Sequence, residues 1–141
     1  MEKKNNKFEK YSDEELRLML AIAMQDDAVK AKNSFIHFVK MVWPEFIDGY
    51  HHNVMAKKFE EIASGKLKRL IVNMPPRHTK SEFASYLFPA WLMGKKPKTK
   101  IIQATHTAEL SYRFGRKMRN LMDDESYRKI FKEVSLRADS K

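Results

Sequence analysis

Apolar residues recur at three- and four-residue steps in several stretches of the chain, the pattern of helices with one buried face. The first stretch begins at a capping box, with Ser12 followed three residues later by Glu15, and continues to about Lys32. We therefore expect a helix over residues 12–32. Its inward-facing residues are predicted to be Leu16, Met19, Leu20, Ala23 and Met24.

Two more helices are predicted before the middle of the chain. Residues 35–43 form the first, which Pro44 stops. This stretch is apolar over most of its surface, so the rest of the fold must cover it. The second spans residues 51–64, and Gly65 is placed to end it in the left-handed conformation.

Two short apolar runs interrupt the helical pattern and are predicted to be strands. Residues 70–72 are apolar and partly β-branched, as in a buried parallel strand, and Pro75 and Pro76 would end it. Residues 100–105 form the second run, and a helical pattern that starts at Lys80 lies between the two. Strand, helix and strand at this spacing predict a right-handed crossover in a parallel sheet. The expected fold class is α/β, with helices flanking that sheet and a helical segment before it.

The last long helical pattern covers residues 107–122, and a short helix is expected to follow over residues 123–131. Arg113, Arg116 and Lys117 lie largely outside the apolar face of the long helix. Such a basic face can contact a phosphate backbone. A solvated charged face is the alternative interpretation.

The junction between the first predicted strand and the next helix reads PPRHTKS over residues 75–81. A phosphate-binding loop uses this position: its amides and the helix end attract a polyphosphate, a Lys reaches the β and γ oxygens, and a Ser or Thr hydroxyl ligates Mg²⁺. Lys80 and Ser81 fit those roles. The regular motif would have glycines where Met74 and Thr79 stand, so a basic turn at the start of a surface helix is the alternative.

The string NMPPRHTKSE, between a predicted strand and a predicted helix, resembles the variant Walker A segment of the large terminase subunits of tailed bacteriophages. The downstream stretch IIQATHTAELSYRFGRKMRNLMDDESYRKIF resembles the same family. This resemblance implies an incomplete P-loop NTPase fold. Residues 1–49 would be an N-terminal helical segment, and residues 50–141 the first part of the ATPase domain, with the Walker A segment but no Walker B or nuclease domain.

The resemblance also implies a function. The chain would be the N-terminal fragment of an ATPase that moves double-stranded DNA into a procapsid, with ATP and Mg²⁺ as cofactors. The full-length family also carries an endonuclease, and we do not expect this fragment alone to be catalytically competent. The implied partners are double-stranded DNA, the small terminase subunit, the portal and further copies in a ring, and the implied location is the host cytoplasm.

Site residues follow from the same resemblance. Lys80 and Arg77 would act on the phosphates, and Ser81 would hold Mg²⁺. The segment upstream of the loop would contribute to an adenine pocket, although a His pair at a helix start is more often solvated or capping. The nucleotide-binding residues would be Pro76, Arg77, His78, Thr79, Lys80 and Ser81, with Tyr50, His51 and His52 as adenine-pocket candidates by position.

Composition is consistent with a polyanionic partner. The chain has 28 Lys and Arg against 18 Asp and Glu, a net charge of +10. It has no cysteine, which excludes disulfides and thiolate metal sites, and no apolar run of the length that a membrane span needs. Two alternatives to the packaging motor stay open: a non-catalytic basic DNA-binding module, and a fragment of a helicase-type P-loop motor.

Overall fold

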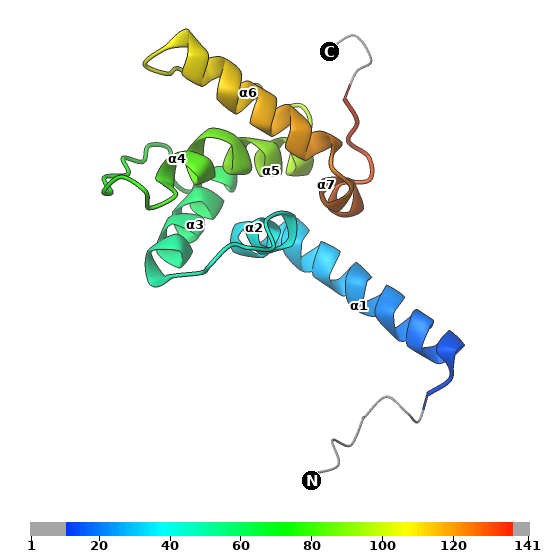
Figure 1. The fold of residues 1–141 in the computed structure, drawn as a ribbon. Coiled ribbons are helices and arrows are strands. Elements are labelled where there is room, and N and C mark those ends of the chain that lie inside the picture. The colour runs from blue at the N-terminus through cyan, green and yellow to red at the C-terminus, as the bar shows by residue number, and fades with distance from the viewer. Residues whose placement is uncertain (1–10, 137–141) are drawn as a thin grey trace.

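The computed structural model describes residues 11–136, and every regular element in that range is a helix (Figure 1). α4, η1 and α5 follow one another without a break, so they form one continuous helix whose middle turn is π-helical. The elements are α1 (Asp13–Asn33), α2 (Phe35–Val42), α3 (Tyr50–Ala63), α4 (Lys80–Glu82), η1 (Phe83–Leu87), α5 (Phe88–Lys95), α6 (Ala108–Asp123) and α7 (Glu125–Ile130).

The predicted parallel sheet is not formed by residues 11–136, so the expected α/β fold, an incomplete P-loop NTPase, is wrong for this structure. Residues 70–72 and 100–105 lie outside any helix and pair with no other strand in that range. Ile71 is 85% exposed and Ile102 is 98% exposed. A strand needs neighbours for its backbone hydrogen bonds, and the part of the chain described here supplies none. The predicted crossover fails for the same reason.

The predicted starts of the helices at residues 12 and 107, and the predicted end of a third helix at Gly65, are confirmed. The Glu15 amide donates to Ser12 Oγ at 3.2 Å, and the Ser12 amide donates to the Glu15 carboxylate at 2.8 Å. Gly65 follows α3 with a φ of 81°, in the left-handed region that favours glycine. Thr107 Oγ1 accepts from the Leu110 amide at 3.3 Å, which fixes the start of α6. Local side-chain chemistry therefore sets where these helices begin and end.

The apolar helix α2 lies at the centre of the core, as its sequence predicts. Phe35, Phe38 and Val39 are fully buried. The ring of Phe35 packs edge to face on Phe59 of α3, at 5.6 Å between ring centroids, and on Phe83 of η1, at 5.4 Å. Aromatic pairs in this geometry stabilise beyond the area that they bury. α2 therefore joins α3 to the helix that begins at Lys80.

Two buried polar side chains connect α5 to its neighbours. Trp91 Nε1 donates to the Ala31 carbonyl at the end of α1, at 3.0 Å. The Tyr127 hydroxyl of α7 donates to the Ala90 carbonyl at 2.9 Å, and burial raises the pKa of Tyr127 above its ordinary value. Each buried donor has a partner, which avoids the cost of an unsatisfied polar group in the core.

α1 extends away from the other helices over most of its length (Figure 1). The inward stripe predicted for it is largely exposed, because Met19, Leu20 and Met24 are not covered and only Ala31, near the end of the helix, is buried. The helices that pack on α1 lie at its C-terminal end. Neither α1 nor any other helix within residues 11–136 has both the length and the apolar content to cross a membrane.

Two helical glycines provide a matched test of the packing. A Cβ on Gly94 would lie 2.5 Å from the ring of Phe131, which is itself buried. We expect Gly94→Ala to lower the free energy of unfolding by about 1–3 kcal/mol. A Cβ on Gly115 of α6 meets nothing within 4 Å, so Gly115→Ala should raise that free energy by up to about 1 kcal/mol. Urea unfolding of both variants measures the contrast, and equal effects would contradict the packing of Phe131 on α5.

Candidate phosphate-binding site

The loop of residues 75–79 leads directly into the helix that begins at Lys80. Arg77 and Thr79 have φ values of 64° and 57°. This left-handed region is uncommon for residues other than glycine, and such turns are found where backbone amides converge on an anion. Thr79, which stands where the regular motif has a glycine, thus adopts the left-handed conformation that glycine favours.

Lys80 reaches back across this loop. Its Nζ donates to the Met74 carbonyl at 2.6 Å, and the side chain is partly buried. Ser81, the next residue, is exposed. The first turn of a helix has amides without partners in the helix, and these carry partial positive charge. The charge of the Lys80 ammonium and the partial positive charge of the helix end therefore both lie where the loop meets the helix.

His52 of α3 connects the loop to the core. It is buried, and its Nε2 lies 2.6 Å from Thr79 Oγ1. The Thr79 hydroxyl donates to the His78 carbonyl at 2.7 Å, so its proton is already used. Neutral His52 must then carry its proton on Nε2 and donate to Thr79. This assignment leaves His52 Nδ1 as a buried acceptor without a partner among the described residues.

Two further histidines surround His52. The ring of His51 lies 3.8 Å from that of His52 and 5.7 Å from that of His78, between ring centroids. Burial lowers the pKa of His52 below its ordinary value, and the neighbouring His51 and His78 lower it further, while Asp48 acts in the opposite direction. His52 is therefore held neutral beside the loop.

Stability should fall in mildly acidic solution because of His52. An unfolded His52 takes up a proton near its ordinary pKa of 6.5, whereas the folded chain takes it up only at lower pH. Between these pKa values the unfolded chain binds more protons, so the free energy of unfolding decreases as the pH falls below about 6.5. Chemical unfolding at several pH values should show this slope, and His52→Gln should reduce it. The control His37→Gln changes an exposed histidine of α2 and should leave the slope intact.

The structure brings only some of the predicted residues together. Residues 76–81 form one continuous loop and helix start, and His51 reaches that loop through His78. Tyr50 is 87% exposed, so it encloses no pocket in this structure. A His pair at a helix start is more often solvated or capping, but His52 is only 6% exposed and lies on the buried face of α3. A signal existed: His52 precedes three buried residues of α3 at helical spacing, namely Met55, Ala56 and Phe59.

Glu82, which sequence reasoning missed, connects the loop helix to α6. Its carboxylate accepts from Lys117 Nζ at 2.8 Å, and the same ammonium lies 5.2 Å from the centre of the Tyr86 ring. Burial, and then the charge of Glu82, raise the pKa of Tyr86 to about 12. Lys117 is thus paired with Glu82 while its side chain stays 42% exposed. Of the three predicted DNA contacts, the other two, Arg113 and Arg116, are exposed.

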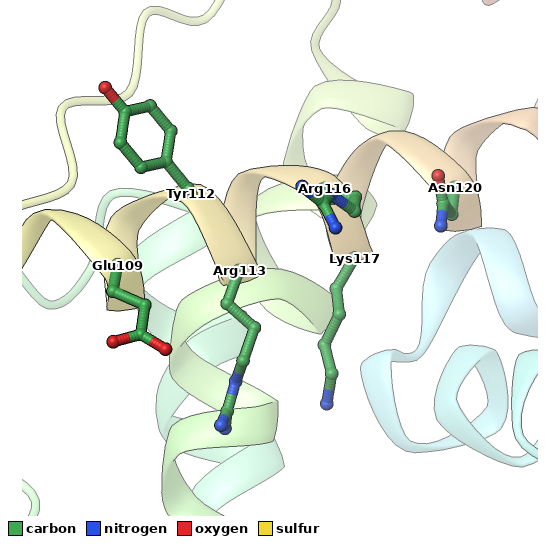
Figure 2. Close-up of a pocket in the computed structure, with 6 residues that line it drawn as sticks. All are labelled: Glu109, Tyr112, Arg113, Arg116, Lys117 and Asn120. Carbon is green, nitrogen blue, oxygen red and sulfur yellow. The ribbon is translucent and has the colours of Figure 1, made fainter.

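A hollow of about 660 Å³ lies along this part of α6 (Figure 2). Figure 2 shows Arg113 and Lys117 extending from one side of the helix, while Tyr112 leaves it on the other. The lining is one helix face of mixed charge, with Glu109 beside the cations. This surface is open, and the exposed Arg113 and Arg116 suit contacts to phosphates more than an enclosed ligand.

No group of three or more His, Asp or Glu side chains within residues 11–136 is arranged to hold a metal ion by itself. A Mg²⁺ ion at the loop would therefore need phosphate oxygens as ligands, which is how Mg²⁺ is commonly held with nucleotides. Ser81, exposed beside Lys80, fits the single hydroxyl ligand that such a site requires.

Comparisons of the chain with protein-family models, curated proteins and solved structures found no match.

Proposed function

We propose that residues 75–81 bind the phosphates of Mg-ATP. The observation that carries this proposal is the placement of Lys80: its ammonium lies against the Met74 carbonyl, at a helix start preceded by the left-handed residues Arg77 and Thr79. The proposal rests on this local geometry and needs no sheet. Backbone amides at a helix start, together with a lysine, form a typical site for a polyphosphate.

Binding would exchange one partner of Lys80 for another. The ammonium would leave the neutral Met74 carbonyl for the β and γ phosphate oxygens, and a hydrogen bond between two charged groups is stronger than one to a neutral acceptor. Ser81 would hold Mg²⁺, whose role is to neutralise phosphate charge. Arg77, exposed in the loop, would contact the γ-phosphate. His52 would keep Thr79 in its left-handed conformation through the 2.6 Å contact.

The resemblance of residues 73–82 to the Walker A segment of phage terminases supports a wider proposal. In it, the nucleotide drives the movement of double-stranded DNA into a procapsid. The net charge of +10 and the exposed Arg113 and Arg116 of α6 suit a DNA partner. Contacts from these arginines to phosphates would hold DNA without reading its sequence.

A second candidate function is a basic DNA-binding module in which the loop is only a turn. The exposed basic face of α6 favours it, because this face could bind phosphates without any nucleotide. The two candidate functions differ in whether Mg-ATP binds to the chain and changes its binding to DNA. The module predicts DNA binding that weakens steeply with salt and is unchanged by Mg-ATP or by substitution of Lys80.

Calorimetric titration of the folded protein with Mg-ATP tests the first proposal, with Mg-AMP as the matched ligand. We expect Mg-ATP to bind and Mg-AMP to bind far more weakly, because AMP lacks the β and γ phosphates that Lys80 would contact. A cooperative thermal melt of the same sample establishes that the protein is folded. Equal binding of the two nucleotides, or no binding of either by the folded protein, would reject the phosphate loop. DNA binding without any response to ATP would then favour the module.

A further inference from the structure

The rest of the chain leaves apolar residues of α1 uncovered on more than one side, Leu20 and Met24 among them. Leu18, Ile22 and Val29 are each more than half exposed. Together with Gln25 they follow steps of four, three and four residues, so they lie on one side of the helix. We call these four residues the α1 stripe. Its spacing is that of the a and d positions of a coiled coil, and α1 is 21 residues long, or three heptads.

A second copy of α1 fits this stripe in the antiparallel direction. With the two helices centred between Ala23 and Met24, Leu18 faces the partner's Val29 and Ile22 faces the partner's Gln25. Every member of the stripe thereby meets another member. This self-complementarity is what an interface with two-fold symmetry requires.

The charges at the two ends of α1 select the same alignment. Asp13, Glu14 and Glu15 form its acidic first turn, and Lys32 lies in its last turn, where Lys30 is already paired with Asp26 of the same helix. In the antiparallel alignment Glu15 falls opposite the partner's Lys32. A parallel pair would instead place Glu15 beside the partner's Glu15, and Lys32 beside the partner's Lys32, which is unfavourable.

A hollow between α1 and α7 supports the same antiparallel alignment. It measures about 480 Å³, and Lys32, Lys129 and Lys132 contribute to its lining together with Val29 of the stripe, although Lys129 is already paired with Glu125 of α7. The acidic first turn of a second copy would reach this basic hollow when the stripes are paired. Opposite charges at both ends of the interface orient the helices and fix their register.

We propose that α1 joins two copies of this chain in an antiparallel dimer through the α1 stripe. Two exposed stripes, apolar except at Gln25, become buried against each other, and the acidic first turn of each helix meets Lys32 of the other. This interface is separate from the loop that begins at Pro75. It does not depend on the proposed nucleotide binding, so either inference can fail without the other.

Disulfide trapping tests both the contact and its direction, because the chain has no cysteine of its own. One preparation carries Ile22→Cys and the other Gln25→Cys, and the two are mixed under mild oxidation. The antiparallel dimer predicts a mixed disulfide that forms at least about tenfold faster than either same-site disulfide, because a disulfide needs its Cβ atoms within about 4.5 Å. Preferential joining of Ile22→Cys to itself would indicate a parallel pair and overturn the proposal.

Sedimentation equilibrium of the cysteine-free chain supplies the affinity. Ile22→Glu should weaken the dimer at least about tenfold, since it puts a charge into the buried stripe. Ala23→Glu is the matched control: it adds the same charge at the next residue, off the stripe, and should change the affinity by less than about threefold. Circular dichroism checks that both variants keep α1 helical. A chain that stays monomeric up to high concentration, or equal effects of the two substitutions, would reject the α1 dimer.

Discussion

Replacing Lys80 with alanine is expected to weaken Mg-ATP binding by roughly 10- to 100-fold. A hydrogen bond to a charged group contributes about 1.5–3 kcal/mol, and Lys80 would make such bonds to two phosphates. The effect should appear in the dissociation constant measured by calorimetry. Thermal stability should change much less, because within residues 11–136 Lys80 donates to a single neutral acceptor, the Met74 carbonyl.

Lys98→Ala is the matched control for this experiment. It removes the same charge from an exposed turn after α5, away from the loop, and should leave Mg-ATP affinity nearly unchanged. If both lysine variants lose affinity equally, the attraction is a general effect of net charge rather than a site. If Lys80→Ala binds as tightly as the unmodified protein while folded, Lys80 has no part in nucleotide binding.

Phe35→Ala should have the largest effect on stability. The ring is fully buried and contacts aromatic rings from α2, α3, η1 and α5. Removing it leaves a cavity that several elements border, and such a change costs about 3–5 kcal/mol of unfolding free energy. We expect the melting temperature to fall by on the order of 10–20 °C. Urea denaturation gives the same comparison as a shift of the midpoint.

Ile47→Ala is the control for Phe35→Ala. Ile47 is also a large apolar residue but is 86% exposed in the connection between α2 and α3. Its replacement should change stability by less than about 0.5 kcal/mol. A loss of similar size in both variants would contradict a core centred on α2. Phe35 is also linked to the phosphate-binding loop. It packs on Phe83, and Phe83 contacts the ring of His52, which contacts Thr79 in the loop.

The helices could be predicted from the sequence because their signals are local. The capping box at Ser12, the glycine after α3 and the threonine before α6 act within one turn of the residues that they cap. The apolar surface of α2 likewise predicted its central position, since such a surface must be covered. Interactions between residues a few positions apart can be predicted from the sequence, and these capping interactions are present in the structure.

The sheet could not be predicted in the same way. Residues 70–72 and 100–105 have the composition of strands, but a strand exists only where another one supplies its hydrogen bonds. That condition concerns distant parts of a chain, and no residue in the described range meets it. The expected inward stripe of α1 failed for a related reason: periodicity identifies an apolar face but does not tell what, if anything, covers it.

The sequence by itself determined the helix ends, the apolar α2 and the position of Lys80 and Ser81 at a helix start, because each depends on residues a few positions apart. Only the tertiary structure decided that His52, 27 positions before Thr79, supports the loop, and that Lys117 pairs with Glu82. It also decided that α1 keeps an exposed apolar stripe. These outcomes depend on which surfaces meet when the helices pack, and packing joins residues that no local pattern relates.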